Sequence, residues 1–173
     1  MVASQDITLE AAMPRDGARL SNLLELYAHD LSDIFPIRVG PDGRFGYDKL
    51  PRYWSEPDSH FPYLIRFNGD LAGFALVTRG SPATDAPDDL DVSEFFVLRC
   101  FRRSGIGRRA AFLLWDRMPG QWVVRVSEMN RGALPFWEGA IREYTHGVYS
   151  EKTHPGKFHM FRVFSFSNAV HND

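Results

Sequence analysis

A glycine turn in the middle of the chain combines residue types that can bind phosphate. Residues 95–109 have the sequence FFVLRCFRRSGIGRR, in which two arginines directly before Ser104 and two directly after Gly107 flank the pair Gly105 and Gly107. Glycine leaves the backbone bare, and the N–H groups at the start of a helix lack intrahelical acceptors. Together with the helix dipole, such a turn can bind a phosphate or pyrophosphate. The alternative is a tight turn that needs glycine only for its positive φ, with solvated arginines around it.

Two other phosphate-binding glycine signatures fit this turn less well. Residues 102–107 match the pattern Arg/Gln-x-x-Gly-x-Gly/Ala. A P-loop requires Lys-Ser/Thr after its last glycine, where this chain has Arg108-Arg109. The dinucleotide fingerprint requires a further small residue, which Ala110 supplies, but also a mononucleotide fold that is not evident in this chain. A nucleotide-phosphate binder therefore remains a minor alternative.

The elements that must position the turn are predicted from apolar periodicity and turn residues. Asn68-Gly69-Asp70 separates two apolar runs and indicates a β-hairpin. In chain order the predicted elements are a strand (6–12), a helix (18–34), a short or broken helix (47–57), a hairpin (61–80), a strand (90–98), a helix (from the glycine turn to 118), a strand (121–127), a helix (130–144) and two closing strands (147–152 and 157–165).

This order predicts a single domain over residues 1–173 with an α/β fold. The expected architecture is a central mixed sheet of about six to seven strands flanked by about four helices. The sheet begins antiparallel, and residues 90–127 form one strand–helix–strand crossover, which requires two parallel strands.

Composition excludes several classes of protein. A hydrophobic fraction of 44% and a charged fraction of 24% are typical of a globular chain. The net charge of −2 argues against nucleic acid as a partner, and no long apolar run predicts a membrane span. The single cysteine, Cys100, excludes an internal disulfide and, with no secretory leader, predicts a cytoplasmic protein. The six histidines show no paired metal-site spacing, so no metal is expected.

Taken together, these segments resemble the GNAT superfamily of acyl-CoA-dependent N-acyltransferases. The resemblance lies in residues 95–118 and in the following NRGALPFW (130–137), and the element order agrees from Ile7 to about Phe166. In that family the strand, glycine turn and helix hold the coenzyme's pyrophosphate, and an Asn-x-x-Ala-x-x-aromatic-aromatic helix completes the cleft. The resemblance implies a GNAT-like fold and an N-acetyltransferase with acetyl-CoA as acyl donor.

The resemblance also implies which residues contact the coenzyme. The backbone of residues 96–98 would lie along the pantetheine arm, and the amides of residues 103–108 would hold the pyrophosphate. Asn130 would hydrogen-bond the coenzyme and is also a candidate helix N-cap. The expected contact residues are Phe96, Val97, Leu98, Arg102, Arg103, Ser104, Gly105, Ile106, Gly107, Arg108, Asn130, Ala133, Phe136 and Trp137.

Two carboxylates before the glycine turn are candidates for the catalytic base. An attacking amine must be neutral, so a group must accept the ammonium proton. In the family a carboxylate or histidine on this strand often does so, and Glu94 and Asp91 stand three and six residues before Val97. The aromatic neighbours of Glu94 in SEFFV predict a raised pKa. The alternatives are an exposed strand face for Glu94 and the solvated acidic loop for Asp91.

The sequence differs from the family pattern at the residue expected to protonate the leaving thiolate. Many relatives have tyrosine at the position of Trp137, and an indole N–H is too weak an acid to replace it. Tyr144, Tyr149 or water could serve instead, while the N–H of Val97 or Leu98 would stabilise the oxyanion. Because this tyrosine is missing, an acyl-CoA-binding sensor or interaction module without turnover is the alternative function.

The acceptor is expected to be a primary amine, on a small molecule or a peptide, that attacks acetyl-CoA directly in a ternary complex. The acidic residues Asp85, Asp88, Asp89 and Asp91 favour a cationic acceptor, whereas the many aromatic residues would equally suit a pocket for an apolar one. Neither nucleic acid nor a membrane is expected as a partner, and edge strands near the C-terminus could pair in a homodimer. Further candidates for lining the acceptor site are Tyr53, Trp54, Phe61, Tyr149, His154 and His159.

Overall fold

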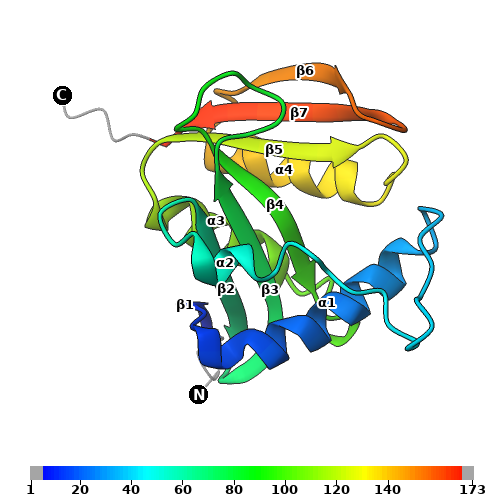
Figure 1. The fold of residues 1–173 in the computed structure, drawn as a ribbon. Coiled ribbons are helices and arrows are strands. Elements are labelled where there is room, and N and C mark those ends of the chain that lie inside the picture. Colours follow the sequence, from blue (N-terminus) through cyan, green and yellow to red (C-terminus); the bar gives the residue numbers. More distant parts are fainter. Residues whose placement is uncertain (1–5, 169–173) are drawn as a thin grey trace.

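The computed structural model describes residues 6–168, which form one seven-stranded sheet with helices on both faces (Figure 1). The strands are β1 (Ile7–Ala11), β2 (His60–Phe67), β3 (Asp70–Arg79), β4 (Leu90–Val97), β5 (Gln121–Ser127), β6 (Ser150–Pro155) and β7 (Met160–Ser167). The helices are α1 (Gly17–Leu31), α2 (Arg52–Ser55), α3 (Ile106–Arg117) and α4 (Ala133–Tyr144), with short 3-10 turns at Pro14–Asp16 and Arg99–Phe101. The predicted order of helices and strands is confirmed.

The sheet is mixed, with the strand order β1-β2-β3-β4-β5-β7-β6. β4 and β5 run parallel, and the other neighbouring strands are antiparallel. α3 connects the parallel pair, as the strand–helix–strand crossover requires. The predicted α/β fold is therefore confirmed.

The helices cover the two faces of the sheet separately. α1 and α2 lie on one face, where Leu20 and Phe74 are completely buried, and α3 and α4 lie on the other, where Trp115 and Ile141 are completely buried (Figure 1). Side chains of a strand alternate between the two faces of its sheet. This alternation directs Glu94 of β4 toward α1.

β4 and β5 separate along their length, and this separation opens the middle of the molecule. They pair only where Leu90–Val92 lies beside Trp122–Val124, although both strands continue beyond these residues. β4 also carries a bulge at Ser93, opposite Leu76 and Val77 of β3. The remainder of β4 therefore has no strand partner on its β5 side.

Several elements end a few residues from their predicted limits, and the clearest case follows α4. The strand predicted from Gly147 begins instead at Ser150. Gly147 has a φ of +85°, and its N–H donates to the Arg142 carbonyl at 2.9 Å, so this glycine terminates the helix. Within residues 6–168, no helix is both long and apolar enough to span a membrane.

Candidate active site

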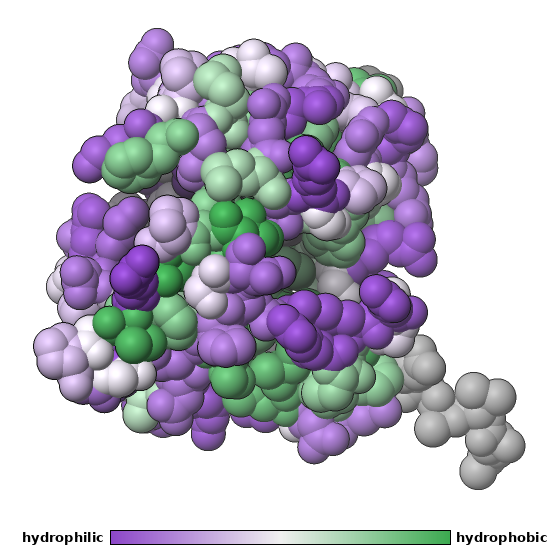
Figure 2. Space-filling model, turned by 90° about the vertical axis from the view of Figure 1, so that its right-hand side faces the viewer, coloured by the Kyte–Doolittle hydropathy of each residue, from purple (hydrophilic) through white to green (hydrophobic). Residues whose placement is uncertain are grey.

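Two adjoining clefts meet where β4 and β5 separate. The turn cleft, of about 560 Å³, lies against the glycine turn, α1 and the start of α4, and the aromatic cleft, of about 590 Å³, lies beside α1, α2 and β5. Both volumes are typical of small-molecule sites. Figure 2 shows a hollowed face on which hydrophobic residues are surrounded by hydrophilic ones. The residues that line both clefts are Tyr27, Leu31, Phe95, Asn130, Ala133 and Trp137.

The glycine turn presents bare backbone to the turn cleft. Gly105 has a φ of +81° and directly precedes α3, and Gly107 is the second residue of that helix. A Cβ at Gly107 would lie 3.3 Å from the Phe136 ring, so this glycine lets α3 and α4 approach closely. The Arg109 N–H donates to the Gly105 carbonyl at 3.1 Å, so the N–H groups of the first helical turn before Arg109 have no intrahelical acceptor. The turn thus has the positive φ of a structural glycine and the free amides of an anion site.

The arginines of the turn are partly committed to contacts within the protein. Arg102 donates through Nε to the Val97 carbonyl at 2.7 Å and through Nη2 to Asp30 of α1 at 2.5 Å. These bonds fasten the turn to the end of β4 and to α1. Arg103 lines the cleft and forms no hydrogen bond or ion pair within residues 6–168, so its charge is available to a ligand.

Most of the predicted coenzyme contacts line the turn cleft. These are Phe96, Val97, Arg102, Arg103, Gly105, Gly107, Arg108, Asn130, Ala133, Phe136 and Trp137. Leu98, Ser104 and Ile106 do not line it. The Ile106 side chain is buried in the core, and the Ser104 hydroxyl donates to the Phe101 carbonyl at 2.8 Å. The wall formed by the end of α1 was not predicted, because the apolar spacing of that helix indicates a packing face only. It consists of Tyr27, Asp30 and Leu31, with Ile34 just beyond the helix.

One amide of β4 points into the gap where an oxyanion contact is expected. The Leu98 N–H donates to the Ala72 carbonyl at 2.8 Å, so the expectation that Leu98 supplies this contact is wrong. Hydrogen-bonding residues alternate along an antiparallel pair, so the Val97 N–H points away from β3 and toward β5. Val97 is the remaining candidate.

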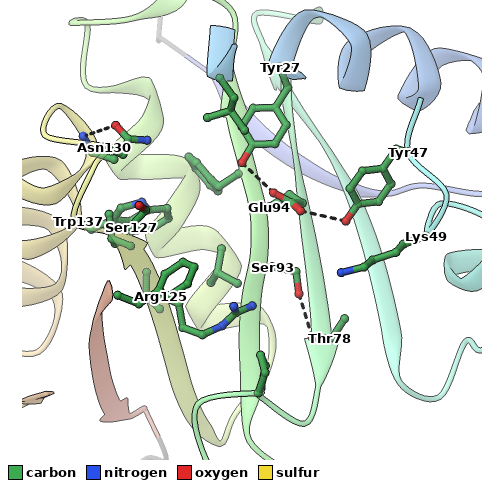
Figure 3. Close-up of a pocket in the computed structure, with 18 of the residues that line it drawn as sticks. Tyr27, Tyr47, Lys49, Thr78, Ser93, Glu94, Arg125, Ser127, Asn130 and Trp137 are labelled. Carbon is green, nitrogen blue, oxygen red and sulfur yellow. Dashed lines mark hydrogen bonds between the residues drawn. The ribbon is translucent and has the colours of Figure 1, made fainter. Parts of the chain in front are cut away.

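Glu94 lies in the aromatic cleft between two tyrosine hydroxyls (Figure 3). Tyr27 donates to Oε2 at 2.8 Å, and Tyr47 donates to Oε1 at 3.0 Å. Burial raises the pKa of the Glu94 carboxyl, although the two phenols and the charges of Lys49 and Arg125 act in the opposite direction. The raised pKa predicted from the aromatic neighbours is therefore confirmed.

The position of Tyr27 distinguishes it from Tyr47. Burial and the Glu94 charge raise the pKa of both hydroxyls. Protonation of Glu94 removes the contribution of its charge and makes both phenols more acidic. Tyr27 lines both clefts, whereas Tyr47 lines only the aromatic cleft. Tyr27 thus carries the hydroxyl that lies between Glu94 and the turn cleft.

Asp91 occupies neither the acceptor site nor a solvated loop. Its side chain is completely buried in β4. Arg125 of β5 donates through Nε and Nη2 to its two carboxylate oxygens at 2.8 Å each, and Ser81 donates to it at 2.5 Å. Asp91 lines neither cleft, but Arg125 lines the aromatic one. The geometry therefore makes Asp91 a support for Arg125 and leaves its predicted role as a base without structural support.

The charged side chains of the aromatic cleft are mostly cationic. Glu94 is the only carboxylate among the described lining residues, and the cations are Lys49, Arg52, Arg79 and Arg125. Asp85, Asp88 and Asp89 do not line the cleft, so the expectation that this acidic segment favours a cationic acceptor is wrong. Ala83 of this segment packs against Val123 of β5 and Val163 of β7, and Asp88 approaches Arg79 at 3.9 Å.

Aromatic and histidine side chains form much of the remaining wall. Of the further candidates predicted for the acceptor site, Tyr53 and His159 line the cleft, whereas Trp54, Phe61, Tyr149 and His154 do not. Among residues 6–168, no three potential metal ligands lie close enough together to hold a metal ion.

Asn130 combines a backbone contact with a place on both clefts (Figure 3). Its Oδ1 accepts a hydrogen bond from the N–H of Ala133, the first residue of α4, at 3.2 Å. Within residues 6–168 its side-chain nitrogen makes no hydrogen bond, so it can donate to a ligand. The N-cap residue of α4 is Gly132, so the prediction that Asn130 is the N-cap is wrong, although its Oδ1 still accepts from the first residue of the helix.

Comparison with known proteins decides which family has this site. Residues 21–140 match the model of a family described as the acetyltransferase (GNAT) family. The chain belongs to this family. The resemblance predicted from the glycine turn is thus confirmed, and the chain is an acetyl-CoA-dependent acyltransferase.

Solved acetyltransferase structures share the fold of this family member. The aminoglycoside acetyltransferase AAC(6')-Ib in complex with coenzyme A has a TM-score of 0.67 at 15% identity, covering 94% of this chain and 95% of that chain. An acetyltransferase from Thermus thermophilus has a TM-score of 0.66 at 13% identity, covering 93% and 96%. A GNAT acetyltransferase from Streptococcus pneumoniae has a TM-score of 0.60 at 15% identity, covering 94% and 99%. At these identities they support the fold alone, and no curated protein matches the sequence.

In this acetyltransferase the two tyrosines expected to replace the missing acid lie outside both clefts. Tyr144 donates to Asp116 of α3 at 2.7 Å, and burial, with this hydrogen bond, raises the pKa of Tyr144 to about 12. Tyr149 packs against Phe164. The expectation that either one protonates the thiolate is therefore wrong. The place of Tyr27 on both clefts was not predicted, because its spacing in α1 indicated only helix packing.

Proposed function

We propose that this acetyltransferase moves an acetyl group from acetyl-CoA to a primary amine by direct attack in a ternary complex. The observation that carries the proposal is that two clefts share one wall, at which Glu94 and Tyr27 are hydrogen-bonded at 2.8 Å. A donor in one cleft and an amine in the other would meet without a covalent enzyme intermediate. Cys100, the only thiol of the chain, lines neither cleft.

In this proposal the turn cleft takes the coenzyme. The amides at Gly105–Arg108 would hold the pyrophosphate, and Arg103 would add a charge-assisted contact. The pantetheine arm would lie along the unpaired side of β4, with the free side-chain nitrogen of Asn130 beside it. The Val97 N–H would then stabilise the oxyanion formed at the thioester carbonyl.

The amine would enter through the aromatic cleft and give a proton to Glu94. A carboxyl with a raised pKa is a stronger base than an ordinary one, which suits this step near neutral pH. The nitrogen lone pair forms the C–N bond, the C–S bond breaks as the oxyanion collapses, and the second proton of the nitrogen is released to solvent. The Tyr27 hydroxyl would protonate the thiolate, and the protonated Glu94 would return a proton to Tyr27. The products are the amide and the free coenzyme thiol, and both side chains regain their starting states.

Initial-rate kinetics with acetyl-CoA and primary amines test this function. Direct attack predicts thiol release that requires an amine, with intersecting double-reciprocal plots; a covalent intermediate would give parallel lines. Acetyl-CoA binding without thiol release from any amine would favour the sensor alternative. Thermal stabilisation by ATP or NAD and not by acetyl-CoA would favour the nucleotide alternative.

Three further predictions belong to this proposal. The chain is proposed to form one domain, because the α3 and α4 face has a single cluster of buried residues from both ends of the sheet. A cytoplasmic location remains a prediction from the single cysteine. A homodimer through the β6 edge also remains a prediction, although the polar sequence SEKTHP of this strand is typical of an edge that avoids pairing.

A further inference from the structure

Arg125 is held rigidly with part of its guanidinium left for a ligand. Asp91 accepts from Nε and Nη2, both at 2.8 Å, and Asp91 is itself completely buried. A guanidinium has five N–H donors, and the two on Nη1 take no part in this pair. The Arg125 side chain is 21% exposed and lines the aromatic cleft. A fixed, partly buried guanidinium of this kind binds a small anion with little loss of conformational freedom.

Lys49 supplies a second available positive charge in the same cleft. It lies in the loop before α2 and lines the cleft, and its ammonium group makes no hydrogen bond or ion pair within residues 6–168. Its charge lowers the pKa of Glu94, so the ammonium group lies near that carboxylate. Figure 3 shows Lys49 and Arg125 extending from opposite sides toward the part of the cleft beside Ser93.

The other two cations of the cleft are more exposed than Arg125. Like Arg125, each has a carboxylate partner: Arg52 donates to both oxygens of Glu56, at 2.9 and 3.0 Å, and Arg79 approaches Asp88 at 3.9 Å. Their side chains are 54% and 39% exposed, against 21% for Arg125, so solvent screens their charges more. Lys49, which has no carboxylate partner, and the less exposed Nη1 edge of Arg125 are therefore the cations best placed to bind an anion.

The rest of the cleft is suited to a compact apolar body beside these charged groups. Aromatic rings form its walls, and they belong to Tyr47, Tyr53, Phe95, Trp137 and Phe161. Its volume of about 590 Å³ is sufficient for a single small molecule.

From these contacts we propose that the acceptor is a small primary amine that also carries an anionic group, of the amino acid type. The inference rests on the proposed function and adds the class of substrate to it. Lys49 and the Nη1 edge of Arg125 bind the anion, the aromatic rings enclose the body, and Glu94 takes the proton of the amine. A polycationic acceptor would meet repulsion from the same two side chains.

Matched pairs of amines test this substrate class. Phenylalanine is compared with phenethylamine and with phenylalaninamide, which keep the aromatic body and the amine but lack the carboxylate. Thiol release is measured with saturating acetyl-CoA, and kcat/KM is expressed per concentration of neutral amine, because the three amines differ in pKa. We expect phenylalanine to be preferred by at least about tenfold, the size of a charge-assisted hydrogen bond. An aminoalkylphosphonate then reports whether the site accepts another anion.

Variants test whether Lys49 and Arg125 cause the preference for phenylalanine. Lys49→Met removes one of the two cations and should lower the ratio of kcat/KM for phenylalanine to that for phenethylamine by about tenfold. The ratio is used because the variant also changes the charge near Glu94. Lys157→Met is the matched control, since Lys157 lines neither cleft, and it should keep the wild-type ratio. Arg125→Lys, checked for folding by circular dichroism, gives a second measure of the same ratio.

The possible outcomes distinguish the inference of an anionic acceptor from the proposed acetyltransferase function on which it rests. Equal or better turnover of phenethylamine, or an unchanged ratio in a folded Lys49→Met variant, would overturn the anionic acceptor while the acetyltransferase proposal stands. If none of the amines releases thiol although acetyl-CoA binds, the proposed function fails and the inference fails with it.

Discussion

Glu94 combines burial with two hydrogen-bond donors, and each has a different effect on its basicity. Burial raises the pKa of the carboxyl, which makes the carboxylate a stronger base, while Tyr27 and Tyr47 stabilise its charged form. Because the two tyrosines oppose the effect of burial, the carboxylate is a stronger base than usual but can still release the proton. In the proposed mechanism, the hydrogen bond to Tyr27 would also give the accepted proton a route toward the thiolate.

The proposed role of Glu94 predicts a large loss of turnover in Glu94→Gln. Glutamine keeps the shape but accepts no proton, so kcat should fall by roughly 10²- to 10⁴-fold while acetyl-CoA affinity is retained. Wild-type kcat/KM should fall as pH decreases through the raised pKa of Glu94, because the protonated carboxyl is no longer a base. Rate–pH profiles check both effects. Glu10→Gln, at an exposed carboxylate bonded to Arg66 at 2.7 Å, is the control. An acid limb that persists in Glu94→Gln would assign the base to another group.

The same raised pKa predicts a pH-dependent change in stability. The folded protein binds the Glu94 proton more tightly than the unfolded chain does, so the contribution of Glu94 to stability is present at low pH and is lost as pH rises through the folded pKa. Glu94→Gln removes this loss. The melting temperature of the variant relative to wild type should therefore increase over the interval from the ordinary glutamate pKa, about 4.3, upward through the raised pKa of Glu94, measured by calorimetry. A difference that decreases over this interval would contradict the raised pKa.

Individual residues differed in how far the sequence could specify them. The aromatic neighbours of Glu94 in the chain were sufficient to predict its raised pKa. Its partners Tyr27 and Tyr47 stand 67 and 47 residues away, so only the fold brings them to it. The sequence around Asp91 is that of an acidic loop, and its burial depends on Arg125 in a different strand. Local composition therefore gave the wrong surroundings for Asp91.

At the scale of elements, the glycine turn predicts the effect of a change at Gly105. Gly105→Glu should reduce acetyl-CoA affinity below detection, because a carboxylate beside the bare amides would repel the pyrophosphate and obstruct its approach. Glutamate at a φ of +81° also strains the backbone by roughly 1 kcal/mol or more. Titration calorimetry on the folded variant measures the affinity.

Gly43→Glu provides the matched control for this variant. Gly43 has a similar φ of +76°, has no atom within 4 Å of the position that a Cβ would take, and lines neither cleft. The control variant should lose stability to a similar degree and keep its affinity for acetyl-CoA. Wild-type affinity in a folded Gly105→Glu variant would place the coenzyme elsewhere.

The order of the helices and strands could be predicted because each one follows from the sequence of its own segment. Apolar periodicity indicates each strand and helix, and Asn68-Gly69-Asp70 indicates the turn between β2 and β3. The separation of β4 from β5 and the bulge at Ser93 were not predicted. These features depend on pairing between distant segments, and no local pattern marks them. The cleft between β4 and β5 was therefore expected only from the resemblance to the GNAT superfamily.

For the whole molecule, the packing of α3 decides whether the chain behaves as one unit. β4 and β5 share only three pairs of residues, so the sheet alone connects its two sides weakly. α3 adds contacts across them, since Trp115 packs against Phe166 of β7 and Arg117 donates to the Leu9 carbonyl of β1 at 3.0 Å. One cluster of buried residues on this face includes side chains from β1, β2, β5 and β7. This continuity predicts cooperative unfolding.

Unfolding should accordingly occur in a single transition that acetyl-CoA shifts upward. Circular dichroism reports the helices and strands, and fluorescence reports the four tryptophans, so coincident curves indicate one cooperative unit. The proposed coenzyme site includes α1, β4 and the start of α3 on one side of the gap and α4 on the other, so the ligand binds only when both sides are folded. At 100 times its dissociation constant, acetyl-CoA should add about 2.7 kcal/mol and raise the melting temperature by roughly 5–10 °C. Two separated transitions would instead show that the strands on either side of the β4–β5 gap unfold independently. If only one transition responded to acetyl-CoA, that side alone would bind the coenzyme.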